Sequence, residues 1–107
     1  MHPCIWRVLL AAGLTVPMFA AATEVVAVAQ RGRLFAVREL AVIRGASVVF
    51  GNEDDFPHQL RISGPGMEFD SDLQAPGEPI QVAFAEAGVF RIRCGIHPRM
   101  SMTVTVR

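Results

Sequence analysis

The chain has 107 residues, and its ten basic residues balance its ten acidic residues to a formal net charge of zero. This length allows one domain and no more. No run of basic residues occurs in the sequence. The chain therefore lacks the electrostatic footprint of a nucleic-acid-binding protein, and its charge alone indicates no partner.

The N-terminal segment has the pattern of an export signal. A short start ends in the positive charge of Arg7, and residues 8–16 form an apolar run that Pro17 interrupts. Residues 20–22 are all Ala and offer an A-x-A cleavage site. A membrane span needs about 20 apolar residues, which is more than this run supplies before its break.

We predict a signal peptide over residues 1–22 and a single domain over residues 23–107, exported to the bacterial periplasm and without a membrane span. An uncleaved membrane anchor is the alternative for the N-terminal segment. Cys4 precedes the apolar run, too early for a lipid-attachment cysteine, so removal of the signal leaves Cys94 as the one cysteine. So small a domain buries only about 60–65% of its unfolded surface. It cannot form an intramolecular disulfide, and a bound metal would help to stabilise it.

After the signal, the sequence is typical of short β-strands joined by turns. Polar and apolar residues alternate in the strand that begins at His58 and in the strand that ends at Cys94, which places both side chains on the inward face. We predict an all-β fold, a β-sandwich of Greek-key type. The expected strands are residues 24–29, 34–43, 46–50, 58–62, 79–85, 89–94 and 101–106, with a short edge element at residues 67–69.

The stretch CGIHPRM carries a thiol, an imidazole and a thioether at spacings of three and three. Two His and one Cys with a weak axial Met form the ligand set of electron-transfer copper sites. Besides His97, only His58 lies outside the N-terminal segment. We therefore predict one copper ion bound by His58, Cys94, His97 and an axial Met. A buried thiol beside a surface histidine is the alternative.

The two histidines also limit the chemistry. One site uses both of them, so no second metal centre can be built from imidazoles, which argues against a multicopper oxidase or a nitrite reductase. Because the four protein ligands fill the predicted site, no coordination position stays open for a substrate. This predicts an electron carrier and not an enzyme.

The axial ligand has two candidates, Met100 and Met102. Met102 falls on the inward face of the last strand and is typical of a core residue, whereas Met100 closes the loop. The motif Cys94-x-x-His97-x-x-Met100, followed by VTV, resembles the C-terminal loop and strand of the cupredoxins, in particular amicyanin and plastocyanin. In that family the distance from the axial Met to the closing V-x-V is fixed, which implies Met100 and not Met102.

The segments FGN (residues 50–52) and FPH (residues 56–58) resemble the first-histidine segment of the cupredoxins. The resemblance covers most of the domain and implies a cupredoxin-like sandwich. It also implies that Asn52 ties the first-histidine loop to the cysteine loop and donates hydrogen bonds near the thiolate; a turn cap is the alternative. Two residues depart from the family pattern. Gln59 replaces a common Asn, and Ile96 replaces a common Pro.

The resemblance further implies where partners dock. In the family the edge of the C-terminal histidine emerges through an apolar patch, which Phe56, Pro57, Ile96 and Pro98 would form here around His97 as the electron port.

We predict a monomer that meets a redox donor and a redox acceptor protein transiently. Arg99 and the acidic residues 53–55 would flank the patch and steer encounter, although a solvated turn is the alternative for residues 53–55. Two other functions stay open. One is a periplasmic copper chaperone or buffer on the same fold, and the other is a β-sandwich binding module that holds zinc or no metal.

Overall fold

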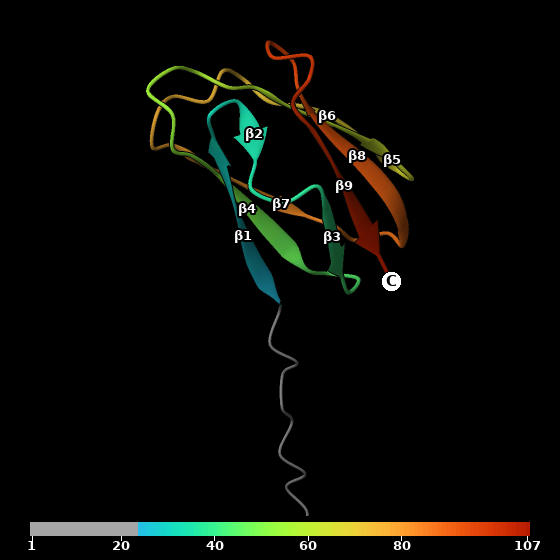
Figure 1. The fold of residues 1–107 in the computed structure, drawn as a ribbon. Coiled ribbons are helices and arrows are strands. Elements are labelled where there is room, and N and C mark those ends of the chain that lie inside the picture. Colours follow the sequence, from blue (N-terminus) through green and yellow to red (C-terminus); the bar gives the residue numbers. More distant parts are fainter. Residues whose placement is uncertain (1–23) are drawn as a thin grey trace, which may run out of the picture.

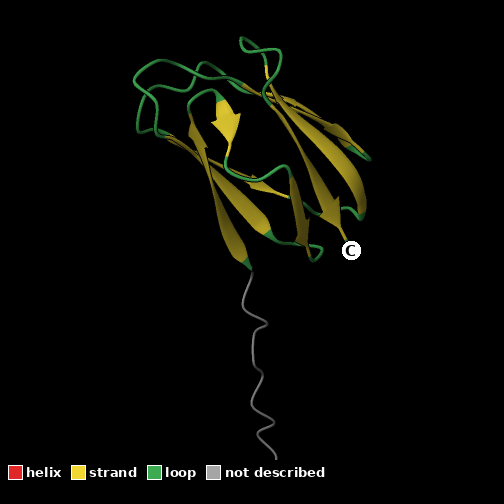
Figure 2. Ribbon diagram, viewed as in Figure 1, coloured by secondary structure: helices red, strands yellow, loops and turns green. Residues whose placement is uncertain are grey.

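The structure is a computed structural model that describes residues 24–107. The predicted signal peptide, its cleavage site and Cys4 lie outside the described residues. The described part folds into strands and loops (Figure 2) and contains no helix that could cross a membrane. The strands are β1 (Val25–Arg31), β2 (Leu34–Phe35), β3 (Glu39–Val42), β4 (Ser47–Asn52), β5 (Leu60–Gly64), β6 (Met67–Asp70), β7 (Pro79–Ala83), β8 (Gly88–Cys94) and β9 (Ser101–Val106).

Two sheets pack face to face (Figure 1). The first sheet has the order β2-β1-β4-β7, and the second has the order β3-β9-β8-β5-β6. Both sheets send alternate side chains into one apolar core, as half-buried strands do. The predicted all-β sandwich is confirmed. The largest fully buried apolar side chains of this core are Phe50, Leu60, Ile62, Phe84, Phe90 and Ile92.

Both sheets are mixed, which the sequence pattern did not predict. β1 runs parallel to β4, and β3 runs parallel to β9, whereas the other paired strands are antiparallel. Parallel neighbours cannot be joined by a tight hairpin and need a longer crossover connection. Between β1 and β4 the chain visits the second sheet through β3, and this excursion supplies the crossover.

The strand expected at residues 34–43 is in fact two strands. β2 pairs with β1 in the first sheet, whereas β3 pairs with β9 in the second sheet. Residues 36–38 carry the chain from one sheet to the other. A continuous strand is impossible here, because its two halves belong to different layers.

The pairing of β5 with β8 brings together the start of β5, next to His58, and the end of β8 at Cys94. The strands are antiparallel in a register that places Leu60 opposite Cys94. The start of β5 and the end of β8 therefore lie side by side. The loop that precedes β5 and the loop that follows β8 both lie at the end of the sandwich away from the C-terminus (Figure 1).

The close packing of Gly64 against Phe90 leads to a prediction about the stability of the domain. A Cβ at Gly64 would overlap the Phe90 ring, which is fully buried and cannot move aside. We expect Gly64→Ala to lower the free energy of unfolding by about 1–3 kcal/mol, as overpacking does. Each kcal/mol corresponds to a fall in Tm of about 4–8 °C in a domain of this size, so thermal and urea unfolding would measure the change.

Gly51→Ala is the matched control, because a Cβ at Gly51 meets no atom within 4 Å. An equal loss of stability in both variants would contradict the packing argument and indicate a general intolerance of Ala in these strands.

Candidate metal centre

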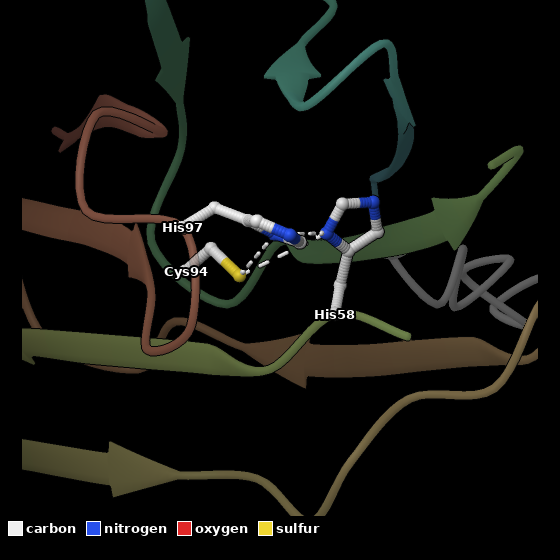
Figure 3. Close-up of side chains that lie close together, drawn as sticks. All are labelled: His58, Cys94 and His97. Carbon is white, nitrogen blue, oxygen red and sulfur yellow. Dashed lines mark hydrogen bonds between the residues drawn. The ribbon is translucent and has the colours of Figure 1, made fainter. Parts of the chain in front are cut away.

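Three potential metal ligands from two distant segments of the chain lie close together (Figure 3). His58 lies just before β5, Cys94 is the last residue of β8, and His97 lies in the loop that leads to β9. The two imidazole Nδ1 atoms are 3.1 Å apart, and the Cys94 Sγ lies 3.4 Å from His97 Nδ1 and 3.8 Å from His58 Nδ1. The structure thus brings together the two histidines and the cysteine that the sequence predicted as ligands.

These separations fit a single ion. Bonds from a metal such as zinc to imidazole nitrogen and thiolate sulfur are about 2.0–2.3 Å long, so two donors on one ion lie roughly 3–4 Å apart. All three donor atoms lie within 4.8 Å of one another. His58 and Cys94 are buried, and His97 is half-buried, so one ligand alone borders solvent. Soft sulfur together with imidazole is a donor set that suits copper.

The loop after Cys94 is closed by its own backbone. The Met100 amide donates to the His97 carbonyl at 2.9 Å, and the Cys94 amide donates to the Met100 carbonyl at 3.1 Å. These bonds turn the chain tightly between β8 and β9, so that His97 comes back toward Cys94.

The two methionines near the site occupy different places. Both side chains are fully buried. Met100 ends the tight loop, whereas Met102 belongs to β9 and stands opposite Ile92 in the second sheet. Met100 as the axial ligand remains a prediction, and Met102 has the strand position expected of a core residue.

His58 is fixed through its backbone by a short bridge to Gln74. The His58 amide donates to the Gln74 carbonyl at 3.0 Å, and the Gln74 amide donates to the His58 carbonyl at 2.7 Å. The buried Gln74 side chain donates to the carbonyls of Phe50 and Glu78 and accepts from Gln30 at 2.7 Å. His58 is therefore attached through Gln74 to β1 and β4 of the first sheet, although β5 itself begins only at Leu60.

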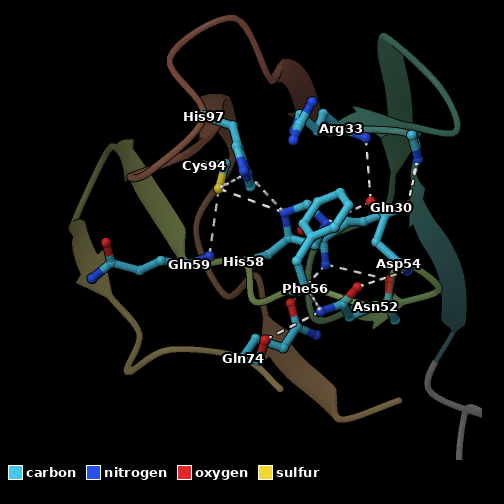
Figure 4. A network of polar contacts seen from close by, with 12 residues as sticks. Gln30, Arg33, Asn52, Asp54, Phe56, His58, Gln59, Gln74, Cys94 and His97 are labelled. Carbon is cyan, nitrogen blue, oxygen red and sulfur yellow. Dashed lines mark hydrogen bonds and ion pairs between the residues drawn. The ribbon is translucent and has the colours of Figure 1, made fainter. Parts of the chain in front are cut away.

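Asn52 belongs to this network and not to the cysteine loop. Its Nδ2 donates to the Phe56 carbonyl at 2.9 Å and to the Gln74 carbonyl at 3.2 Å, and its Oδ1 accepts from the Asp54 amide. Within the described residues, these side-chain bonds join the first-histidine loop to Gln74, and none of them reaches the cysteine loop (Figure 4). The structure thus differs from the bridging role that the resemblance implied, because the Asn52 amide donates to Phe56 and Gln74 and not to the cysteine loop.

Besides the two histidines, the backbone amide of Gln59 contacts the thiol, and its nitrogen lies 3.5 Å from Cys94 Sγ. Such an N–H donor stabilises a thiolate by sharing its charge. The β5–β8 register brings this amide to the sulfur, so a backbone group supplies what the sequence led us to expect from Asn52.

Asp54 orients the His58 ring. Its Oδ2 lies 2.8 Å from His58 Nε2, and the carboxylate also accepts from the amides of Gly32 and Arg33 at 2.7 and 3.2 Å (Figure 4). Burial by itself raises the pKa of Asp54, but the hydrogen bonds from Gly32, His58 and Arg33 outweigh it and lower that pKa below its ordinary 3.8. The ionised carboxylate draws the imidazole proton to Nε2, which leaves Nδ1 free to bind a metal.

His97 is also held in the form that can bind a metal. Burial lowers the pKa of His97 below its ordinary 6.5, and the charges of His58 and Arg33 lower it further, against an opposing effect of Asp54. A neutral imidazole offers its lone pair to an ion, whereas a protonated one does not.

The surface around His97 is formed by residues from both loops. The Phe56 ring stands edge-on to both His58 and His97, with ring centres 5.4 and 5.5 Å apart. Phe56 is half-buried, whereas Pro57, Ile96 and Pro98 are exposed. These four residues are the predicted docking patch, and all of them lie on the two loops that carry the histidines.

Sequence reasoning assigned Asp54 only to the steering charges at residues 53–55 and missed its contact with His58, and it also missed Gln74 and the Gln59 amide. A carboxylate four residues before a candidate ligand histidine is a signal that could have indicated Asp54. Nothing in the sequence pairs Gln74 with His58, because that bridge depends on how residues 71–78 return to the core.

Comparison with solved structures yields three informative neighbours. An amicyanin variant, in a reduced Cu(I) form at pH 4, is 21% identical, with a TM-score of 0.72 over 82% of this chain and 87% of its own. A purple cupredoxin from Nitrosopumilus maritimus is 23% identical, with a TM-score of 0.69 over 77% of this chain and 99% of its own. A copper-containing nitrite reductase from Thermus scotoductus is 27% identical, with a TM-score of 0.73 over 92% of this chain but only 26% of its own. No protein-family model and no curated protein matches the sequence.

From the contact between Asp54 and His58 we predict how a substitution changes metal affinity. In Asp54→Asn, an amide that donates to His58 Nε2 would place the ring proton on Nδ1, the nitrogen that faces the other ligands. We expect a loss of metal affinity of about 10–100-fold, the usual effect of removing such a partner. Competition of the protein with a chelator for Cu(I) and for Zn(II) would measure it.

Asp55→Asn is the matched control, because Asp55 is exposed and makes the same change of charge. If both variants lose affinity equally, the effect is one of net charge and the orienting role of Asp54 is wrong.

Proposed function

We propose that this chain, which has the fold of the cupredoxins, carries single electrons between two redox proteins through one copper ion. The ligands in this proposal are His58, Cys94 and His97, with Met100 as the axial ligand. The single observation that carries it is the cluster of two Nδ1 atoms and one thiol within 4.8 Å of one another. Two imidazoles and a thiolate with a weak thioether are the donor set of electron-transfer copper sites.

Bound copper would supply a one-electron couple between Cu(I) and Cu(II). The surrounding residues favour such a couple because they restrict movement of the donors. The backbone of His58 is bonded to Gln74, its ring is bonded to Asp54, and the Cys94 loop is closed through Met100. Donors that keep their places in both oxidation states need little reorganisation when an electron arrives or leaves.

His97 is the proposed electron port. It is the one half-buried member of the cluster, whereas His58 and Cys94 are buried. The exposed residues Ile96 and Pro98 flank it, so a partner that covers this patch would approach the site through the His97 ring. We further propose a periplasmic, monomeric carrier that is not an enzyme, with transient partners; the N-terminal pattern of residues 1–22 supports export.

The first test is the visible spectrum of the domain, expressed from Thr23, after addition of Cu(II). We expect an intense charge-transfer band from the Cys94 thiolate to copper and complete loss of this band in Cys94→Ser, whose hydroxyl is not a thiolate donor. Ser101→Ala, at an exposed position just after the loop, should leave the band unchanged.

Two outcomes of this test contradict the proposal, and redox cycling of the copper-loaded protein with a metal-free acceptor protein gives a third. Absence of any copper uptake would indicate a binding module of another kind. A band that persists in Cys94→Ser would remove Cys94 from the site. Rapid loss of copper to a metal-free acceptor protein during redox cycling would favour a copper chaperone or buffer.

The axial ligand makes a separate prediction. Met100→Leu removes a weak donor that stabilises Cu(II) more than Cu(I), so we expect a higher reduction potential. A tenfold change in the ratio of the two affinities corresponds to about 59 mV for one electron, and we expect a shift of about that size in protein-film voltammetry.

Met102→Leu is the matched control, because Met102 is equally buried but lies in β9. If Met102→Leu shifts the potential and Met100→Leu does not, then the axial assignment is reversed.

A further inference from the structure

An apolar hollow opens beside His97. It has a volume of about 430 Å³ and is lined by residues 96–100 together with Arg33 and Leu34. Two large apolar residues of this lining are exposed to solvent, Leu34 over 62% and Ile96 over 43% of its surface. The predicted docking patch therefore continues from the cysteine loop onto the tip of the β1–β2 hairpin, which the sequence did not associate with the site.

Asp54, which contacts the ligand His58, also fixes the tip of the β1–β2 hairpin. Gly32 and Arg33 form the turn with φ of 63° and 59°, and Arg33 is the one non-glycine residue with positive φ among residues 24–107. Residues other than glycine rarely adopt this left-handed backbone conformation, and where they do, the surrounding structure stabilises it. Here Asp54, which orients His58, accepts hydrogen bonds from both turn amides.

The Arg33 side chain is fixed as well. Its guanidinium carbon lies 4.9 Å from the centre of the Phe56 ring, and the same ring stands edge-on to His97. Figure 4 shows Arg33 and Phe56 together at the edge of the site. The turn therefore presents a positive charge and the apolar Leu34 at a defined place beside the proposed electron port.

The charged residues that line the hollow are both basic. Arg33 and Arg99 line it, and no acidic residue does. A second hollow, of about 510 Å³, shares Leu34 and Arg99 with the first and adds Arg38 and a single acidic residue, Glu39. Across residues 24–107, no carboxylate lies within 4.0 Å of any of these three guanidinium groups. Their charges are free to act on a partner.

We propose that the β1–β2 tip and residues 96–100 form one docking face for a redox protein whose own docking surface has an apolar centre and an acidic rim. This inference rests on the proposed function, because it takes His97 as the electron port. The exposed side chains of Leu34 and Ile96 pack against the apolar centre, and Arg33, Arg38 and Arg99 pair with the acidic rim. Charge pairs of this kind mainly accelerate encounter and set partner choice.

Stopped-flow kinetics with two small oxidants test the charge of the face. One electron leaves the reduced protein and converts ferricyanide to ferrocyanide, or a tris(phenanthroline) complex of cobalt(III) to cobalt(II). We expect the anionic oxidant to react faster at low salt. That rate should fall several-fold when ionic strength rises from about 10 mM to about 150 mM, which shortens the screening length from about 30 Å to about 8 Å.

Arg33→Gln and Arg99→Gln should each slow ferricyanide and speed the cobalt complex, whereas Arg91→Gln, an equal loss of charge at an exposed position on β8, should do neither. Unchanged rates in both variants would overturn the proposal. A faster reaction with the cationic oxidant would also overturn it and favour the acidic residues 53–55 as guides.

A titration that needs no electron transfer gives an independent result. A synthetic peptide with two central leucines flanked by glutamates is added to the ¹⁵N-labelled, Cu(I)-loaded protein, or to the metal-free protein if copper does not bind. We expect amide shifts at residues 32–34, 96, 97, 99 and 100, weakened in Arg99→Glu and absent when lysines replace the glutamates. Shifts on the outer face of β8, or none, would overturn the docking face. Failure of the copper test with these shifts intact would instead overturn the proposed function alone.

Discussion

The pairing of β5 with β8 is the constraint on which the rest of the site depends. Its register sets Leu60 opposite Cys94, so the residues just before β5 meet the end of β8. A slip of one residue would turn every side chain of the strand to the opposite face, and Cys94 would then face solvent. The buried residues Leu60, Ile62 and Ile92 specify the register. The core therefore positions the metal ligands, and the site adds only the loops that complete it.

Asp54 joins two parts of the molecule that the sheet topology leaves separate. Its carboxylate accepts from His58 on one side and from the Gly32 and Arg33 amides on the other. Because one side chain makes all these bonds, the orientation of a ligand ring and the placement of the β1–β2 tip are coupled. A carboxylate with three donors is also favoured in its ionised form, which keeps this connection intact at neutral pH.

The sequence predicted those features that depend on local pattern. Alternation of polar and apolar residues placed His58 and Cys94 on the inward face, and the spacing of three placed His97 within reach of Cys94; the structure has both. The sequence did not predict the contacts that depend on crossovers between the sheets. The parallel pairs, the division of residues 34–43 into two strands, and the bridge between His58 and Gln74 all join segments that are distant in the sequence.

The misplaced role of Asn52 shows the same limit in physical terms. A side-chain amide near a predicted ligand can serve its own loop or a distant one, and residue type does not decide between them. Here the nearer carbonyls of Phe56 and Gln74 occupy its Nδ2, while the register of β5 and β8 delivers the Gln59 amide to the sulfur. Once the strands are paired, a backbone donor lies beside the thiol with any residue except proline at position 59. The hydrogen bond to Cys94 Sγ therefore depends on the pairing of the strands and not on a neighbouring side-chain amide.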